Sequence, residues 1–199
     1  MASSRISETG TFVADLLPRA GTRWCEYEKK ALEIRKIAGI GLSDRLDPEH
    51  LALLLNYKIV RLTSIDDLSD TTRIKISAQW SGAALSIDHY GSDFAGLIII
   101  NDLQSHRRQR ATLMEEICHL LLGHRPSRLD QTGRSYDRQT EEEAYAVGAA
   151  SLLPFKPLAE LYQADSNLSA IAERFDVSLA LVRYRLRVLR LTHYPKTSI

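Results

Sequence analysis

Three residues near the middle of the chain have side chains and a spacing that could bind a metal ion. Glu115, Glu116 and His119 lie within residues 113–124, which read LMEEICHLLLGH. Residues four positions apart share one face of a helix, so Glu115 and His119 can reach a single ion. Glu116 is offset by about 100° and lies beside them, where a carboxylate can serve as a general base. A third ligand must come from another segment, and residues 141–143 supply three glutamates.

The same residues also fit a purely structural role. Helical turns rich in glutamate are commonly solvated, and His119 could be a hydrogen-bonded core residue. The pattern E-x-x-x-H is frequent by chance, so it does not establish a metal site without support from the surrounding segments.

Hydrophobic periodicity and capping signals predict the helices that must position these side chains. Asp47 before Pro48 is the expected N-cap of one helix, and Thr140 is the expected N-cap of the helix with the three glutamates. Gly123 is expected to end the helix that carries Glu115. The predicted helices cover residues 24–38, 48–56, 108–122, 140–153, 158–162, 168–175 and 178–191.

Between the early and late helices, four segments rich in β-branched residues predict strands: 57–63, 74–80, 83–89 and 96–101. Their short connections favour a mostly antiparallel arrangement. The order of helix, strands and helices predicts an α+β fold. We expect a small, mostly antiparallel sheet packed against the metal-site helix, followed by a C-terminal helical bundle.

The composition limits the classes of function. The 199 residues are 44% hydrophobic and 26% charged with a net charge of +1, which is typical of a globular protein without a general affinity for nucleic acid or membrane. Residues 1–23 are expected to form a flexible N-terminal arm and residues 24–199 a single domain. Without a secretory signal or a membrane-spanning run, a cytoplasmic protein with no membrane partner is expected. Cys25 and Cys118 are expected to be free thiols.

Residues 167–191 are similar in pattern to a helix-turn-helix. Three arginines of the second helix could face DNA. Three apolar residues of that helix form a stripe that is expected to pack against the domain. DNA is therefore not the expected partner, although a DNA-binding regulator remains an alternative. The arginines are Arg183, Arg187 and Arg190, and the apolar residues are Val182, Leu186 and Leu189.

Several segments together resemble the ImmA/IrrE metallopeptidases. RATLMEEICHLLLGH is similar to the family pattern R-F-T-x-x-H-E-x-x-H-L-L-L-G-H, and EEEAYAVGAASLLP is similar to E-A-x-x-F-A-x-x-L-L-x-P. GLIIIND and AIAERFDVSLALVRYRL resemble further family segments in the same order. The resemblance covers roughly residues 26–191.

This resemblance implies a zincin-like domain with one divalent metal ion. It assigns His119 and, by counting back from Pro154, Glu143 as ligands, and Glu116 as the base that activates water. The chain departs from the family at Glu115, where the pattern has His. His124, just beyond the helix, is a candidate for a residue that contacts a metal ligand and orients it without binding the ion itself.

Glutamate is a competent zinc ligand, so Glu115, His119 and Glu143 could still hold an ion. Zinc is the expected metal, and two carboxylates also make manganese or iron plausible. The leading hypothesis is an intracellular peptidase that cleaves or regulates a protein on a separate chain, such as a repressor. The alternative is an inactive pseudopeptidase that binds a regulator, toxin or antitoxin.

Overall fold

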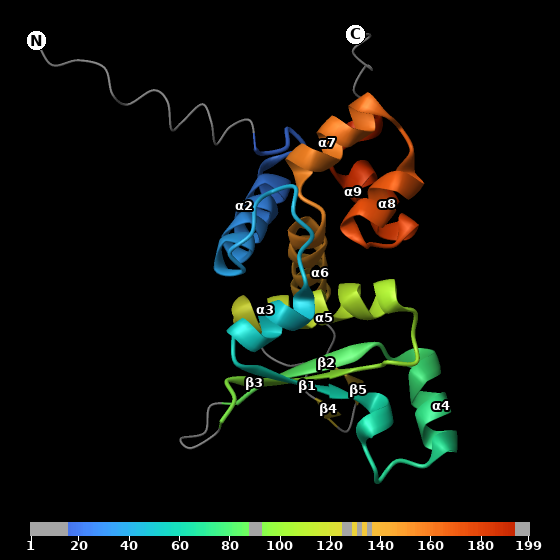
Figure 1. Ribbon diagram of the computed structural model, residues 1–199. Helices are drawn as coiled ribbons and strands as arrows, with labels where there is room; N and C mark the ends of the chain where they lie inside the picture. The colour runs from blue at the N-terminus through green and yellow to red at the C-terminus, as the bar shows by residue number, and fades with distance from the viewer. Residues whose placement is uncertain (1–15, 88–92, 125–128, 131–132, 135–136, 194–199) are drawn as a thin grey trace, which may run out of the picture.

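The computed structural model describes residues 16–87, 93–124, 129–130, 133–134 and 137–193 (Figure 1). The helices are α2 (Thr22–Ile37), α3 (Pro48–Leu54), α4 (Asp70–Gln79), α5 (His106–Leu121), α6 (Arg138–Leu152), α7 (Phe155–Ala164), α8 (Leu168–Phe175) and α9 (Leu179–Val188), with short 3₁₀ turns η1 (Leu62–Ser64) and η2 (Leu191–His193). The strands are β1 (Tyr57–Arg61), β2 (Gly82–Ser86), β3 (Gly96–Ile100), β4 (Leu129–Asp130) and β5 (Gly133–Arg134). These elements confirm the predicted α+β class.

The main sheet is mixed and has the strand order β1-β3-β2. β1 runs parallel to β3, with Tyr57 opposite Gly96, whereas β2 runs antiparallel to β3, with Gly82 opposite Ile100. β4 and β5 form a separate two-stranded sheet. The predicted meander misses the parallel pair, because β1 reaches its partner only after the chain has passed through α4 and β2.

The prediction of a strand over residues 74–80 is wrong, because this segment belongs to helix α4. The hydroxyl of Ser69 accepts a hydrogen bond from the backbone N–H of Thr72 at 3.3 Å, which caps the first turn. Arg73 then donates to the carboxylate of Asp70 at 2.9 Å and to the carbonyl of Ile65 at 2.6 Å. These polar contacts stabilise the first turn of the helix, which then continues through residues 74–79 despite their short alternation of apolar and polar residues.

Helix α5 lies between the main sheet and helix α6 (Figure 1). Ile98 and Ile100 of β3 are almost fully buried. At Gly82 of β2, an added Cβ would lie 2.6 Å from Cγ2 of Thr112 and 3.3 Å from Cγ of Glu116. Strand β2 therefore lies directly on the helix, and only glycine allows this approach.

Capping residues define where helices α3, α5 and α6 begin or end. Asp47 caps α3 as predicted, accepting from a backbone N–H at 3.0 Å. Gly123 has φ 67° and follows the end of α5, also as predicted. The predicted N-cap Thr140 is wrong, because α6 begins two residues earlier. Asp137 is the cap, accepting from the backbone of Gln139 at 3.0 Å and from the hydroxyl of Thr140 at 2.6 Å.

The C-terminal helices pack onto the domain through the predicted stripe. Val182, Leu186 and Leu189 are exposed by 0%, 3% and 1%, respectively. Asp176, in the turn between α8 and α9, adopts a left-handed conformation with φ 50°. Its carboxylate accepts from Arg107 of α5 at 3.2 Å and also pairs with Arg45. The helix-turn-helix-like segment is thus an integral part of the fold.

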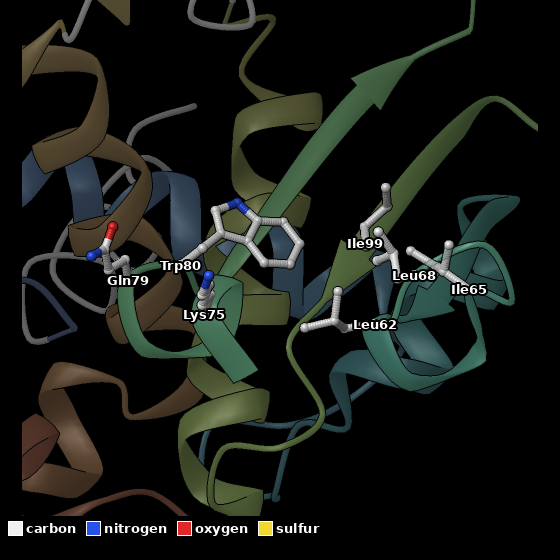
Figure 2. A pocket seen from close by; sticks show the side chains of 7 residues that line it. All are labelled: Leu62, Ile65, Leu68, Lys75, Gln79, Trp80 and Ile99. Carbon is white, nitrogen blue, oxygen red and sulfur yellow. The ribbon is translucent and has the colours of Figure 1, made fainter. Parts of the chain in front are cut away.

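A hollow of about 650 Å³ lies on the side of the sheet away from α5 (Figure 2). Side chains alternate along a strand, so Ile99 of β3 faces this hollow while its buried neighbours face α5. The hollow shares no residue with the metal-ligand pattern and is mostly apolar. Its lining residues are Leu62, Ile65, Leu68, Lys75, Gln79, Trp80 and Ile99.

Two further expectations concern membranes and thiols. Within the described part of the chain, no helix combines the length and apolar character needed to cross a bilayer. Cys25 and Cys118 are free thiols, as predicted, and Cys118 is buried. Burial raises the pKa of the Cys118 thiol well above its ordinary value, which argues against a nucleophilic role.

Candidate metal centre

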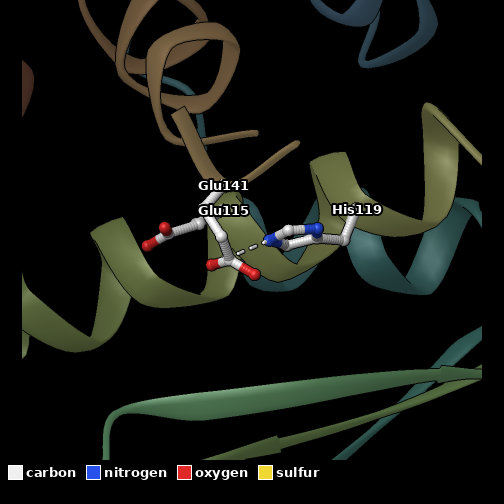
Figure 3. A group of neighbouring side chains, drawn as sticks. All are labelled: Glu115, His119 and Glu141. Carbon is white, nitrogen blue, oxygen red and sulfur yellow. Dashed lines mark ion pairs between the residues drawn. The ribbon is translucent and has the colours of Figure 1, made fainter. Parts of the chain in front are cut away.

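Three side chains from two packed helices form a group that could hold a metal ion. Glu115 and His119 of α5 and Glu141 of α6 each offer one ligand atom, and these atoms all lie within 4.8 Å of one another (Figure 3). Nε2 of His119 is 3.7 Å from a carboxylate oxygen of Glu141. Ligands in a tetrahedral zinc site are about 3.4 Å apart, given metal–ligand distances near 2.1 Å. The ligand types suit a divalent ion, and the three ligand atoms would have to move closer together to bind one tetrahedrally.

Close packing of α6 against α5 brings Glu141 to this group. A Cβ added at Gly148 would lie 3.4 Å from the backbone nitrogen of Glu115 and from the carbonyl group of Met114. Glu141 precedes Gly148 by seven positions, which is about two helical turns, so both residues lie on the same face of α6. That face is the one applied to α5.

Glu143, the third ligand implied by the resemblance, lies outside this group. It is two positions beyond Glu141 and therefore points about 200° away around the helix. Its carboxylate pairs with Lys30 of α2 and lies 3.5 Å from Nε2 of His124. Counting back from Pro154 did not reveal this difference. The packing of α6 against α5 at Gly148 determines that Glu141, and not Glu143, faces Glu115 and His119.

Glu116 lies beside the group and on the side of α5 that faces the sheet. Its Cγ is close to strand β2, because a Cβ added at Gly82 would lie 3.3 Å from it. Its side chain is partly exposed. The residue predicted to act as the base thus lies next to edge strand β2, about 100° around α5 from Glu115.

His124 lies next to His119 because of the way α5 ends. Gly123 turns the chain back, its N–H donates to the carbonyl of Leu120 at 3.2 Å, and the N–H of His124 donates to the carbonyl of His119 at 2.9 Å. This is the Schellman pattern, which brings the residue after the glycine against the last turn of the helix. The two imidazoles share a hydrogen bond of 3.2 Å between their Nδ1 atoms.

The electrostatic environment of Glu115 is unfavourable to its charge when no cation is present. Burial is the largest cause and the neighbouring carboxylate of Glu141 adds to it, raising the pKa of Glu115 from 4.5 to about 7. Arg108 acts in the opposite direction. A bound cation would reverse the balance, because it favours ionised carboxylates at this point.

This shift predicts a pH dependence of the free energy of unfolding of the metal-free protein. Glu115 ionises near pH 4.5 when unfolded and near pH 7 when folded, so the folded state binds more protons between these values. Stability should therefore fall as pH rises through this window, by about 3 kcal/mol in total. Glu115→Gln should lack this component and should exceed the wild type in stability above pH 7.

Urea unfolding at several pH values, with chelator present, measures this effect. The difference between wild type and Glu115→Gln cancels the contributions of titrating groups that do not interact with Glu115. Parallel stability curves for the two proteins from pH 4 to pH 8 would contradict the environment described for Glu115.

The arginines considered for DNA binding form a separate surface. Arg183, Arg187 and Arg190 are exposed. The guanidinium of Arg187 lies 5.9 Å from the ring centre of Tyr184, which also contacts Tyr145 of α6 edge to face. These arginines belong to the outer side of the packed C-terminal segment and not to the metal-ligand group.

A helix packed on a small sheet, with two potential ligands four positions apart and a carboxylate beside them, defines a metallopeptidase-like domain. Residues 65–187 match the model of the IrrE N-terminal-like domain, and the chain belongs to this family. The match confirms the resemblance to the ImmA/IrrE metallopeptidases and includes α4 to α8 and most of α9. No curated protein matches the chain.

Proposed function

We propose that the protein is a divalent-metal-dependent peptidase that cuts a protein partner and holds its ion with Glu115, His119 and Glu141. The observation that carries the proposal is the convergence of these three ligand atoms from two helices, within a family of metallopeptidase-like domains. Three protein ligands leave room for water or substrate, as catalytic zinc sites require.

The donor set indicates which ions would bind. Two ionised carboxylates balance the charge of a divalent cation, whereas the usual two histidines and one glutamate leave a positive surplus. Zinc remains the expected ion, and manganese or iron gain from the larger share of oxygen ligands. A bound cation would polarise the scissile carbonyl of the substrate.

The protein's own contribution to the chemistry is made mainly by Glu116. Its carboxylate takes a proton from the attacking water and then returns a proton to the amine that leaves when the peptide bond breaks. Its place next to edge strand β2 suits a substrate that approaches along the edge of the sheet. Because Glu115 replaces a histidine, the ion and its ligands would carry less net positive charge and would polarise the substrate carbonyl less. We therefore expect a slower reaction than in a site with two histidines.

We place this activity in the cytoplasm, with a regulatory protein on a separate chain as the substrate. The two free cysteines support a reducing compartment. The ordinary charge balance supports a protein partner over nucleic acid.

The metal content of protein purified without chelators tests the proposal. One divalent ion per chain is expected in the wild type, whereas Glu115→Ala and Glu141→Ala should lose it because two ligands remain. Glu115→His should bind zinc at least as tightly as the wild type. Inductively coupled plasma mass spectrometry and zinc titration give the stoichiometries.

Glu142→Ala is the matched control, because this neighbouring carboxylate pairs with Arg23 outside the ligand group. It should keep the ion. A folded wild type that takes up no zinc, manganese or iron would overturn the peptidase proposal and favour the pseudopeptidase, which binds its partner without cutting it.

A further inference from the structure

Beyond the ligand group lies a chain of polar contacts that runs from α5 to α2. Nδ1 of His119 is 3.2 Å from Nδ1 of His124, and Nε2 of His124 is 3.5 Å from a carboxylate oxygen of Glu143. The other oxygen of Glu143 pairs with Lys30. Each ring nitrogen of the two histidines therefore faces a polar group, since Nε2 of His119 faces Glu141.

We infer that His124 and Glu143 are positioning residues that orient His119 for metal binding. This inference rests on the proposed function and assigns Glu143 a role outside the ligand set. Nε2 of His124 faces the carboxylate of Glu143 at 3.5 Å, and Nδ1 of His124 accepts a hydrogen bond from Nδ1 of His119.

The positions of the ring protons leave one arrangement in the metal-bound state. A neutral imidazole carries one N–H, so His119 that binds an ion through Nε2 must carry its proton on Nδ1. The partner nitrogen of His124 must then be the acceptor. The proton of His124 is consequently on Nε2, where it faces the carboxylate of Glu143.

The surroundings restrict the movement of the His124 ring and of the Glu143 carboxylate. The side chain of His124 is only 10% exposed, and the turn at Gly123 determines where its ring lies. Lys30 neutralises Glu143 and holds it from the side of α2. Ligand histidines generally donate their second N–H to such a partner, which sets the tautomer and the ring orientation.

The inference also explains why two glutamates of one helix have different tasks. Glu141 lies on the face of α6 applied to α5, whereas Glu143 lies on the face directed at His124 and Lys30. Removing Glu141 should therefore remove a ligand, and removing Glu143 should loosen a ligand that remains in place.

The experiment compares the zinc affinity of variants by competition with a chromophoric chelator, with circular dichroism to verify folding. His124→Leu should weaken zinc binding by about 10- to 100-fold. His124→Gln should restore affinity to within about threefold, because its amide can accept from His119 and donate to Glu143. His50→Leu, an exposed histidine of α3, is the control and should have no effect.

Glu143→Ala should still bind one zinc ion with reduced affinity, whereas Glu141→Ala should lose stoichiometric binding. The reverse result would make Glu143 the ligand and overturn the inference. Unchanged affinity in His124→Leu would overturn it as well.

Nitrogen-15 spectra of the histidine rings give a second measurement. In zinc-loaded protein, His119 should be protonated at Nδ1 and His124 at Nε2. If the wild type takes up no metal, the proposed function fails on that result. The hydrogen bond between the two rings is then tested in metal-free protein, where the Nδ1 of one histidine must carry a proton and the Nδ1 of the other must not. Spectra that show no hydrogen bond between the rings would overturn the inference, independently of the result for the proposed function.

Discussion

Glu116→Gln is expected to retain the metal ion and to lose peptide hydrolysis by about 10²- to 10⁴-fold. The amide has nearly the shape of the carboxylate, but it cannot accept a proton from the attacking water. Since Glu116 lies on the sheet side of α5 and outside the ligand group, metal binding should not change. A proteome-derived peptide library, with new termini detected by mass spectrometry, measures cleavage even when the natural substrate has not been identified.

Glu142→Gln is the matched control, because it makes the same chemical change at a partly exposed carboxylate outside the ligand group. It should cleave at the wild-type rate. If Glu116→Gln cleaves the library as fast as the wild type while both contain metal, then Glu116 is not the base.

Arg185→Leu is expected to lower the free energy of unfolding by about 3–5 kcal/mol. Arg185 and Glu28 form an ion pair at 2.6 Å, and each is only 1% exposed. Arg185 also donates to the carbonyl of Leu153 at 3.0 Å, and Glu28 accepts from the backbone N–H of Phe155 at 2.5 Å. The leucine variant leaves a buried carboxylate without its cation, which costs far more than the lost contact alone.

Urea unfolding monitored by circular dichroism measures this loss. Arg185→Lys keeps a positive charge and should lose less stability, so the effect stays measurable if the leucine variant does not fold. Lys36→Ala removes an exposed pair with Glu33 and should change stability by less than about 1 kcal/mol. Equal losses in Arg185→Leu and Lys36→Ala would contradict the role of the buried pair.

The parts of the fold that could be predicted from the sequence are those that depend on local patterns. The cap at Asp47, the stop at Gly123 and the apolar stripe of α9 all follow from neighbouring residues, and the structure confirms them. Helix α4 was missed because a short alternation such as Ile74-Lys75-Ile76 fits a strand as well as a helix. The capping contact at Ser69 was the available signal.

The candidate site was predictable where one helix supplies it. Glu115, Glu116 and His119 share α5, so their relation follows from helical geometry. The third carboxylate depends on how α6 rotates against α5, and that rotation is set by tertiary packing at Gly148. Periodicity within α6 does not contain this information, and Glu141 and Glu143 could therefore not be told apart by counting residues.

The pairing of distant segments has a consequence for the order of folding. The central strand β3 pairs with β1 only after α4 and β2 have intervened, and Glu28 meets Arg185 across 157 positions of sequence. Forming such a contact requires closing a long loop, and the entropy cost of closure comes before the contact stabilises the fold. Folding is therefore slow. During synthesis, Glu28 of α2 cannot pair with Arg185 until nearly the whole chain has been made. Completion of the domain should thus be a late event that requires α9.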